Sequence, residues 1–383
     1  MTPRTNPPPQ PYISWQEGNE TRQALWCVPG DPPHPDHVRV VDDTLTADQA
    51  FRLASQGTAM LWRGDYRNAR QLLVALAHRV DHRPRKRKQP DSPHDAFNQH
   101  RLAQSQRATQ LNQLLIPMEG DGAVALRHAP DVRAACRDAL GDVGEPFVLP
   151  LRAVQGMVGA HEWRRKGVAV PVLDEPIHVH YGVFSPIRGE YLDLIAQTPL
   201  PATDLAFDIG TGSGVLAAIL ARRGVARVVA TDSDPRALAC ARENVETQGL
   251  TGRVTVQEAD LFPSGACGLI VCNPPWLPAR PTTSLESAIY DPGSRMLRGF
   301  LDGLADHLLP EGEGWLILSD LAERLGLRAP DFLATAIGRA GLRVVGRLDT
   351  RPRHPKVLDT SDPLHAARRD EVTTLWRLTV AHP

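Results

Sequence analysis

The sequence predicts an α/β protein whose C-terminal part is a doubly wound, mostly parallel sheet, preceded by a mainly helical N-terminal region. From Leu205 onward, apolar runs typical of strands alternate with segments of helical periodicity, which favours a parallel sheet covered by helices on both faces. Upstream, apolar residues recur three and four positions apart, which favours helices. A stretch rich in proline and charge at residues 82–93 separates two parts of that upstream region.

The first 36 residues hold many of the prolines, including Pro7-Pro8-Pro9. Proline fixes φ and lacks an amide hydrogen, so this stretch is predicted to be an extended arm. Helices are predicted over residues 47–55 and 66–80, where Ala69, Leu72 and Leu76 share one face. Residues 82–93 then read as an exposed linker, because prolines and charges interrupt the helical pattern.

Between the linker and residue 180 the pattern is mixed, and over Phe147–Trp163 helix and strand cannot be told apart. The other predicted elements are a helix over Asp95–Leu115, a weak strand over Ala123–Arg127, a short helix over Asp131–Leu140, a strand or hairpin over Ile177–Phe184 and a helix over Ile187–Ala196. We therefore expect three regions: a proline-rich arm with helices over residues 1–90, a mixed α/β region that recognises the substrate over 91–180, and a catalytic domain over 181–383.

The C-terminal part carries regular start and stop signals. Asp234-Pro235, for example, places an N-cap acid before a proline at the first helical position. The predicted strands are Leu205–Ile209, Arg227–Thr231, Arg253–Gln257, Leu269–Cys272, Trp315–Ser319, Leu342–Leu348 and Val372–Val380. The predicted helices are Val215–Arg223, the one opened by Asp234-Pro235, Ser294–Leu308 and Asp331–Ala340, with a turn over Pro310–Gly314. The last two strands have no predicted helix between them, which favours an antiparallel pair at the end of the sheet.

Composition excludes several classes of protein. The formal net charge of -1 gives no global attraction to nucleic acid or to an anionic membrane. No run of about 18 apolar residues exists, and the start, Met1–Pro11, lacks the apolar core of a secretory signal. The five cysteines are scattered and form no Cys-x-x-Cys pair, which predicts reduced thiols and a cytoplasmic location.

A glycine-rich turn follows the first C-terminal strand, with Asp208 at the strand end and then Gly210-Thr211-Gly212-Ser213-Gly214. Glycines allow a ligand to approach the backbone closely, and the next helix presents free amides at its N-terminus. The glycines follow a G-x-G-x-G spacing, not the G-x-G-x-x-G of nicotinamide dehydrogenases, so a nucleoside with an amino-acid tail suits the turn better than a dinucleotide. A tight turn with no ligand is the alternative interpretation.

Two acids after later strands extend this interpretation. Asp232 ends the second strand, where an acid can accept hydrogen bonds from ribose hydroxyls, while Asp234 is better explained as a helix cap. Asp260 follows the third strand and either binds an adenine amino group or is a surface acid.

The segment Asn273-Pro274-Pro275-Trp276 follows an apolar strand and suits a planar nitrogen group. The side-chain oxygen of Asn273 and the carbonyl of Pro274 can each accept one N–H bond, which directs the nitrogen lone pair. The prolines make a rigid corner, and Trp276 offers a flat face on which a base or amide can stack. An ordinary turn with a core aromatic is the alternative.

Taken in order, FDIGTGSG, the acid of ATDSDP, the EADLF segment and NPPW resemble class I S-adenosylmethionine-dependent methyltransferases of the amino-group branch, which includes the methyltransferase small domain enzymes. Within that branch the chain resembles the release-factor glutamine methyltransferases, which have D-x-G-T-G-S-G, N-P-P-Y and a helical N-terminal domain. Residues 288–297 loosely resemble the segment that follows N-P-P-Y in those enzymes. The resemblance covers about residues 181–319 and implies a Rossmann-like, seven-stranded methyltransferase sheet.

The resemblance also implies the cofactor, S-adenosyl-L-methionine, and the residues that bind it. The implied cofactor-binding residues are Asp208, Gly210, Thr211, Gly212, Gly214, Asp232, Ser233, Asp260, Leu261 and Asn273. Of these, Asp208 and the glycines hold the methionine part, Asp232 the ribose, and Asp260 lies near the adenine. The implied catalytic residues around the methyl acceptor are Asn273, Pro274, Pro275 and Trp276. Trp276 stands where the family usually has Tyr or Phe, and the N-terminal region is about twice the expected length, so the choice of substrate stays open.

Three functions remain open at this point: methylation of a protein glutamine, which we prefer narrowly, methylation of an exocyclic amine of an RNA or DNA base, and a non-catalytic binding module. A basic run favours the second slightly, as a contact for nucleic acid, and comprises Arg83, Arg85, Lys86, Arg87 and Lys88. A solvated linker is the alternative interpretation of this run. No metal site is expected, since His178 and His180 have no nearby acid or cysteine in the sequence pattern.

Overall fold

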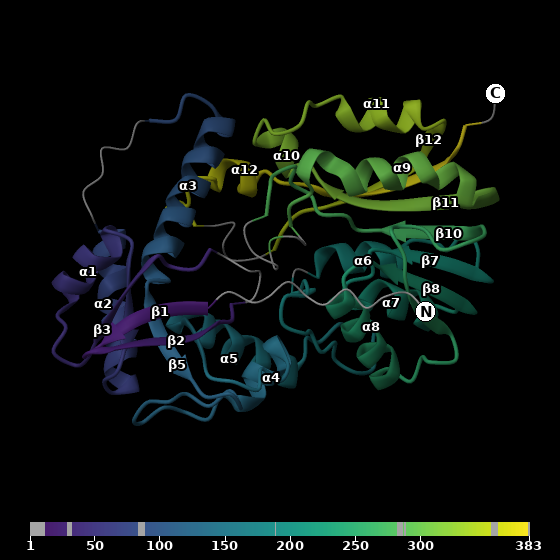
Figure 1. Ribbon diagram of the computed structural model, residues 1–383. Coiled ribbons are helices and arrows are strands. Elements are labelled where there is room, and N and C mark those ends of the chain that lie inside the picture. The colour runs from purple at the N-terminus through teal and green to yellow at the C-terminus, as the bar shows by residue number, and fades with distance from the viewer. Residues whose placement is uncertain are drawn as a thin grey trace. The chain divides into compact units, whose positions relative to one another are not determined.

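The computed structural model describes residues 12–28, 33–82, 89–187, 189–281, 286, 289–353 and 359–381, and the chain forms two compact units (Figure 1). The first unit comprises residues 1–89 and 99–162, and the second comprises residues 90–98 and 163–383. No helix among the described residues is long and apolar enough to cross a membrane.

The first unit is built on a six-stranded mixed sheet in the order β1-β2-β6-β5-β4-β3. Its strands are β1 Tyr12–Glu17, β2 Glu20–Trp26, β3 His37–Val41, β4 Thr58–Trp62, β5 Leu114–Met118 and β6 Phe147–Pro150. Its helices are α1 Ala47–Ser55, α2 Tyr66–Asp81 and α4 Arg133–Leu140, while α3 Pro93–Leu111 and α5 Leu151–Lys166 each continue into the second unit. The sheet is curved, because Trp15 on one edge strand and Val38 and Val40 on the other belong to one hydrophobic cluster.

The prediction of a mainly helical N-terminal region is therefore wrong. Residues 12–26, predicted as part of an extended arm, form the hairpin β1–β2, and the helix predicted over Asp95–Leu115 ends at Leu111. β5 is buried at all five of its residues and β4 at four of five, so neither shows the alternation of apolar and polar residues that marks a half-buried strand. A short strand that is buried on both faces is hard to distinguish from part of a buried helix by periodicity.

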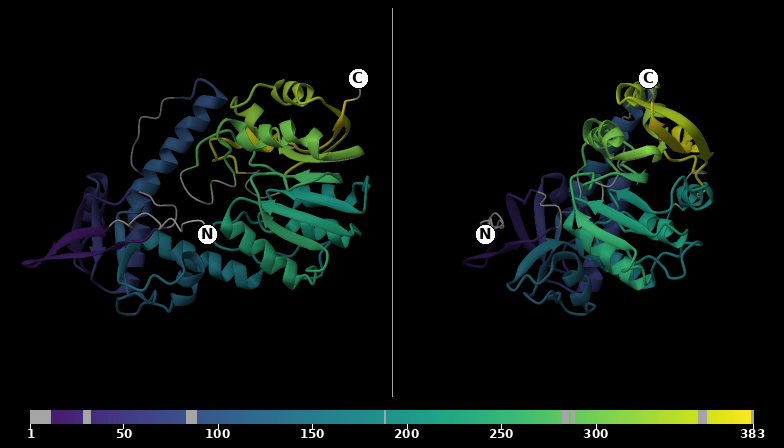
Figure 2. Two further views of the ribbon diagram at one scale, coloured as in Figure 1. Left: turned by 45° about the vertical axis from the view of Figure 1, so that its right-hand side comes forward. Right: turned by 90° about the vertical axis from the view of Figure 1, so that its right-hand side faces the viewer.

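The second unit is the predicted doubly wound sheet of seven strands, in the order β12-β13-β11-β10-β7-β8-β9. The strands are β7 Leu205–Ile209, β8 Arg227–Asp232, β9 Val254–Glu258, β10 Cys267–Cys272, β11 Leu308–Ser319, β12 Leu342–Thr350 and β13 Thr373–Val380. β13 alone runs against its neighbours, β11 and β12, which confirms the predicted antiparallel closing pair. Figure 2 shows these strands side by side, coloured teal to yellow.

Helices cover both faces of this sheet. Side chains of α6 Glu190–Gln197, α7 Val215–Arg222 and α8 Pro235–Thr247 form one core with the sheet, and those of α9 Arg295–His307 and α11 Phe332–Arg339 form another on the opposite face (Figure 1). Two short helices complete the unit, α10 Leu321–Arg324 and α12 His365–Arg369. This arrangement confirms the fold predicted for the C-terminal part.

Two local predictions in the second unit are wrong. Ile177–Phe184 is not a strand: only Ile177 pairs, through an isolated bridge to Val168. The turn expected over Pro310–Gly314 lies inside β11, where Glu311 adopts a positive φ of 63° without ending the strand. Leu308 pairs with Cys267 and Glu313 with Leu269, so the register shifts here and residues 309–312 form an irregular stretch within the strand, not a separate turn.

The central position of β10 makes its side chains critical for stability. Ile270 is fully buried, so Ile270→Ala should lower the free energy of unfolding by about 2–5 kcal/mol. Val344→Ala on edge strand β12, where the side chain is 43% exposed, should change it by less than about 0.5 kcal/mol. Urea denaturation of both variants tests this, and equal losses would mean that the sheet is not packed as described.

Candidate active site

The candidate site lies where the chain changes direction across the sheet. β7 pairs with β8 on one side and with β10 on the other, both in parallel. Ile209 pairs with Cys272, so the next residues, Gly210 and Asn273, open their loops side by side at the carboxyl end of the sheet. Ligands of open α/β sheets bind in the crevice at such a point. The structure therefore brings together the glycine-rich turn and the Asn-Pro-Pro-Trp segment.

Two glycines of the glycine-rich turn differ in the space beside them: Gly210 is covered by another side chain, and Gly212 is not. Gly210 has a φ of 70°, and a Cβ there would lie 2.3 Å from Cε of Met296, so a side chain of α9 already contacts the turn at this point. Gly212 also has a positive φ, of 56°, but a Cβ there would meet no atom within 4 Å. Space for a ligand is thus found at Gly212, whereas the sequence offered no sign that Met296 lies over Gly210.

Asp208 is a buried carboxylate with an unused oxygen. Its Oδ2 accepts hydrogen bonds from Oγ1 of Thr211 at 2.6 Å and from the amide of Ala217 at 3.1 Å. Its Oδ1 has no partner among the described residues. Burial raises the pKa of Asp208 to about 6, against the lowering effect of these two hydrogen bonds. A buried acceptor without a donor fits a ligand that brings its own N–H group, such as the ammonium of an amino-acid tail.

Asp232 is held directly beside this turn. Its Oδ2 accepts the amide of Gly212 at 2.9 Å and its Oδ1 accepts the amide of Asp234 at 2.9 Å. A carboxylate has about four lone-pair positions, so these bonds orient Asp232 and leave two for other donors. Asp234 caps α8 through the amide of Arg236, as the sequence predicted.

The remaining residues predicted near the cofactor are less enclosed. The side chain of Asp260 is 76% exposed and pairs with Arg295 at 3.3 Å. Ser233 is exposed, and Leu261 has a positive φ of 75°, with its carbonyl accepting Oγ1 of Thr231 at 2.6 Å. Their roles at the ribose and adenine stay predictions.

The Asn-Pro-Pro-Trp segment contains an internal hydrogen bond that the sequence did not reveal. Nε1 of Trp276 donates to Oδ1 of Asn273 at 2.9 Å. The carbonyl of Trp276 accepts Nη2 of Arg328 at 3.1 Å, and the same Nη2 lies 3.3 Å from Oγ of Ser294. The Arg328 side chain is almost fully buried, and desolvation lowers its pKa. Arg328 is far from the segment in sequence and carries no motif that could have identified it.

The loop after this segment is fixed by backbone pairing. The amide of Leu277 donates to the carbonyl of Ile289, and the amide of Asp291 donates to the carbonyl of Leu277 at 2.8 Å. The buried Asp291 carboxylate then accepts the amides of Met296 and Leu297 at the start of α9. Residues 289–297 include most of the segment that resembles the glutamine methyltransferases. They connect the Asn-Pro-Pro-Trp segment to α9, the helix that contacts Gly210.

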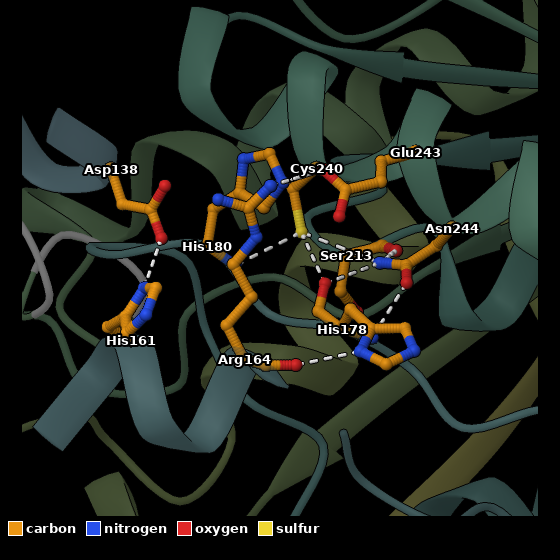
Figure 3. Close-up of polar contacts among 9 residues, drawn as sticks. All are labelled: Asp138, His161, Arg164, His178, His180, Ser213, Cys240, Glu243 and Asn244. Atoms are coloured by element: carbon orange, nitrogen blue, oxygen red, sulfur yellow. Dashed lines mark hydrogen bonds and ion pairs between the residues drawn. The ribbon is translucent and has the colours of Figure 1, made fainter. Parts of the chain in front are cut away.

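Asn244 on α8 joins the turn to the segment that precedes the sheet (Figure 3). Its Oδ1 accepts the amide of His178 at 2.7 Å, and its Nδ2 donates to the carbonyls of His178 at 2.9 Å and Ser213 at 3.0 Å. Asn244 is buried, and its three contacts satisfy backbone groups of the half-buried His178 and the buried Ser213. The Asn244 side chain of α8 therefore links the glycine-rich turn, through Ser213, to the backbone of His178.

The two histidines considered as metal ligands have protein partners (Figure 3). Nδ1 of His178 donates to the carbonyl of Arg164 at 2.7 Å, while Nε2 of His180 lies 2.7 Å from Glu243, which also pairs with Arg164 at 2.6 Å. Within the described ranges, no group of three or more His, Cys, Asp or Glu residues could hold a metal ion. The basic run of residues 83–88 lies outside the described residues.

The raised pKa of Asp208 predicts a specific pH dependence. The folded-state pKa of about 6 lies above the ordinary 3.8, so the native protein binds this proton more tightly than the unfolded chain does. The resulting stability is fully present below about pH 4 and is lost as the pH rises through about 6. The free energy of unfolding of the wild type relative to Asp208→Asn should therefore fall by about 2 kcal/mol between pH 4 and pH 7.

Urea denaturation of the ligand-free protein across this pH range measures the difference. Asp204→Asn, at an exposed carboxyl just before β7, supplies a control for the loss of one negative charge. A flat difference for Asp208→Asn would mean that its carboxylate is solvated in the folded protein.

Comparison with known proteins agrees with this geometry. Residues 176–319 match the methyltransferase small domain family. A release factor glutamine methyltransferase of Cereibacter sphaeroides is 33% identical over 160 residues, which cover 38% of this chain and 56% of that protein. One from Moorella thermoacetica is 40% identical over 115 residues, covering 28% and 41%. A tRNA1(Val) (adenine(37)-N6)-methyltransferase of Shewanella amazonensis is 28% identical over 182 residues, covering 43% and 78%.

The chain spans only about half the length of the two glutamine methyltransferases that it matches. The match nevertheless covers β7 to β11, with the glycine-rich turn and the Asn-Pro-Pro-Trp segment inside it. Residues 176–319 are therefore a methyltransferase small domain, of the S-adenosylmethionine-dependent methyltransferase family.

Proposed function

We propose that the second unit transfers a methyl group from S-adenosylmethionine to the nitrogen of a planar amide or amino group, and that the acceptor is a glutamine side chain of a protein. The observation that carries the proposal is the register of β7 and β10, which sets Asn273 beside the glycine-rich turn. The preference for glutamine rests on the names of relatives that share this segment.

In this proposal the turn and its neighbours hold the cofactor. The open space at Gly212 receives it, Asp208 offers its unpartnered oxygen to the ammonium of the methionine part, and Asp232 offers its remaining lone pairs to ribose hydroxyls. Ser233, Asp260 and Leu261 complete the nucleoside end. When bound, S-adenosylmethionine supplies a methyl group on a positively charged sulfur, which a nitrogen lone pair can attack.

Asn273 and Pro274 make the acceptor nitrogen reactive by orienting it. The lone pair of an amide or exocyclic amine is delocalised and is a poor nucleophile. Hydrogen bonds from its two N–H groups to Oδ1 of Asn273 and to the Pro274 carbonyl direct the lone pair toward the methyl group. Such positioning can lower a barrier by roughly 7–11 kcal/mol, and no protein base is required when the nitrogen loses its proton to solvent afterwards.

The roles of Asn273 and Asp232 are separable by mutation. Asn273→Ala should leave the dissociation constant of S-adenosylmethionine within about threefold of wild type and lower turnover by about 100-fold or more, because the side chain that it removes acts mainly on the acceptor and on Nε1 of Trp276. Asp232→Ala should do the reverse and weaken cofactor binding first. Isothermal titration and transfer of labelled methyl groups measure the two effects. Equal loss of cofactor binding and turnover in Asn273→Ala would contradict the acceptor role of Asn273. Absence of cofactor binding by the wild-type protein would favour the non-catalytic binding module.

A second candidate acceptor is the exocyclic amine of an RNA base, and a groove in the first unit favours it. The groove, of about 510 Å³, lies between β3 and α1 and is lined by Arg39, Arg52 and Arg63 among others. Arg63 is held by Glu17 through two hydrogen bonds, of 3.0 and 2.8 Å. Arg39 and Arg52 make no side-chain hydrogen bond or ion pair with other described residues. Guanidinium groups in a groove suit phosphate oxygens, and Asp42 is the acid that lines this groove beside them.

This candidate predicts a change in salt dependence. Arg39→Ala with Arg52→Ala should reduce the slope of log K against log salt for single-stranded RNA by about 1.4, at roughly 0.7 for each phosphate that is no longer neutralised. A matched control is the double variant Arg67→Ala with Arg70→Ala, which removes two exposed arginines of the same unit outside the groove. Fluorescence anisotropy with a labelled transcript gives the slopes. Identical slopes for both double variants would remove the support for an RNA acceptor.

A further inference from the structure

The indole N–H of Trp276, at Nε1, donates a hydrogen bond to Oδ1 of Asn273 at 2.9 Å. In the proposed function this same oxygen accepts a hydrogen bond from the group that is methylated. An indole N–H can only donate, so the oxygen end of the Asn273 amide must face the ring and its NH2 end must point elsewhere. The oxygen has two lone pairs, and the bond to Trp276 leaves one of them for another donor.

Trp276 is itself anchored on several sides. Its half-buried ring packs against the hydrophobic cores on both faces of the sheet. Its carbonyl is bonded to the buried Arg328, which also contacts Ser294. The following residue, Leu277, is paired with backbone on both sides of Tyr290. The indole N–H therefore has a fixed position from which it can orient a neighbouring side chain.

We propose that Trp276 is a positioning residue, which sets the orientation of the Asn273 amide so that its oxygen, and not its NH2 group, meets the acceptor. The inference rests on the proposed function. It differs from the role expected from the sequence, in which the ring of Trp276 only stacks on the acceptor. Tyr or Phe at this place could also stack, but neither ring carries an N–H group.

The chemical consequence of losing this bond follows from the shape of an amide. The oxygen and NH2 ends of Asn are nearly the same size, so without a neighbour that selects one of them both orientations are sterically allowed. If the NH2 end of Asn273 faces the methyl acceptor, it meets the N–H groups of that molecule. Two hydrogen-bond donors then face each other, and the nitrogen to be methylated is not held in place. The effect falls on turnover, because the reactive arrangement is populated less often.

Kinetics of Trp276→Phe provide the first test. This variant keeps an aromatic ring and removes the N–H group, so kcat should fall about fivefold to tenfold, in line with the loss of one neutral hydrogen bond. KM for the acceptor and the dissociation constant of S-adenosylmethionine should stay within about twofold. Trp376→Phe on β13 is the matched control, since its indole N–H bonds no described residue and its loss should leave kcat unchanged.

The hydrogen bond itself can be tested without activity. In protein labelled with ¹⁵N at the indole nitrogen, the Trp276 signal is identified by its absence from Trp276→Phe. Its proton should exchange slowly with D2O, and Asn273→Ala should shift this signal and speed its exchange while the Trp376 signal stays in place. An unchanged Trp276 signal in Asn273→Ala would show that the bond is absent and would overturn the inference.

The remaining outcomes separate this inference from the proposed function. Wild-type kcat in Trp276→Phe, together with strong loss in Trp276→Ala, would mean that the ring acts by stacking alone and would overturn the inference while the methyl transfer stands. Absence of S-adenosylmethionine binding by the wild-type protein would overturn the proposed function and the positioning role with it. A lower kcat in Trp276→Phe at constant KM, with the indole signal sensitive to Asn273, supports both.

Discussion

The parallel pairing of β7 with β10 is the interaction on which the rest of the second unit depends. Among the strands described, it alone joins the half of the sheet made by β7–β9 to the half made by β10–β13. Four residue pairs, from Leu269–Ala206 to Cys272–Ile209, fix its register. A shift by one residue would turn the apolar side chains of a strand to the opposite face, and here both faces are buried. The same register that preserves the core therefore sets where Gly210 and Asn273 begin.

Much of the second unit could be predicted because its signals are local. A helix cap and proline at Asp234-Pro235, glycines directly after a strand, and apolar runs of strand length each mark an element without help from distant residues. The first unit could not be predicted in this way. Thr58–Trp62 and Leu114–Met118 are short and, apart from Thr58, apolar, and it is their pairing with each other and with β3 and β6 that shows that they are strands. Proline at position 117 lies within a strand, against its usual tendency.

The candidate site shows the same division. Sequence order alone identified Asp208, Asp232 and the Asn-Pro-Pro-Trp segment, because each lies at or directly after the end of a strand. The residues that support them were not predictable: Arg328, Met296 and Asn244 reach the site from a loop and two helices, and their types are common on any helix or loop. Their importance arises from the packing of α8 and α9 on the sheet, which no local pattern encodes.

The supports of the site also differ in character. Arg328 and Asp291 fix the backbone around Trp276 and the start of α9, next to the Asn-Pro-Pro-Trp segment. Beside the glycine-rich turn the structure tolerates a costly group, the buried Asp208, whose second oxygen is unpartnered among the described residues. A protein that keeps such a group in its interior loses stability unless a ligand supplies the missing donor.

Asn244 has a consequence for motion. Because its one amide group bonds the backbone of His178 and the carbonyl of Ser213, the segment around His178 cannot separate from α8 without breaking bonds that also restrain the glycine-rich turn. Native-state hydrogen exchange is therefore expected to show the two stretches of chain opening together. The restraint on the turn thus includes residues that precede the sheet, and the match to the methyltransferase small domain, which starts at residue 176, includes them as well.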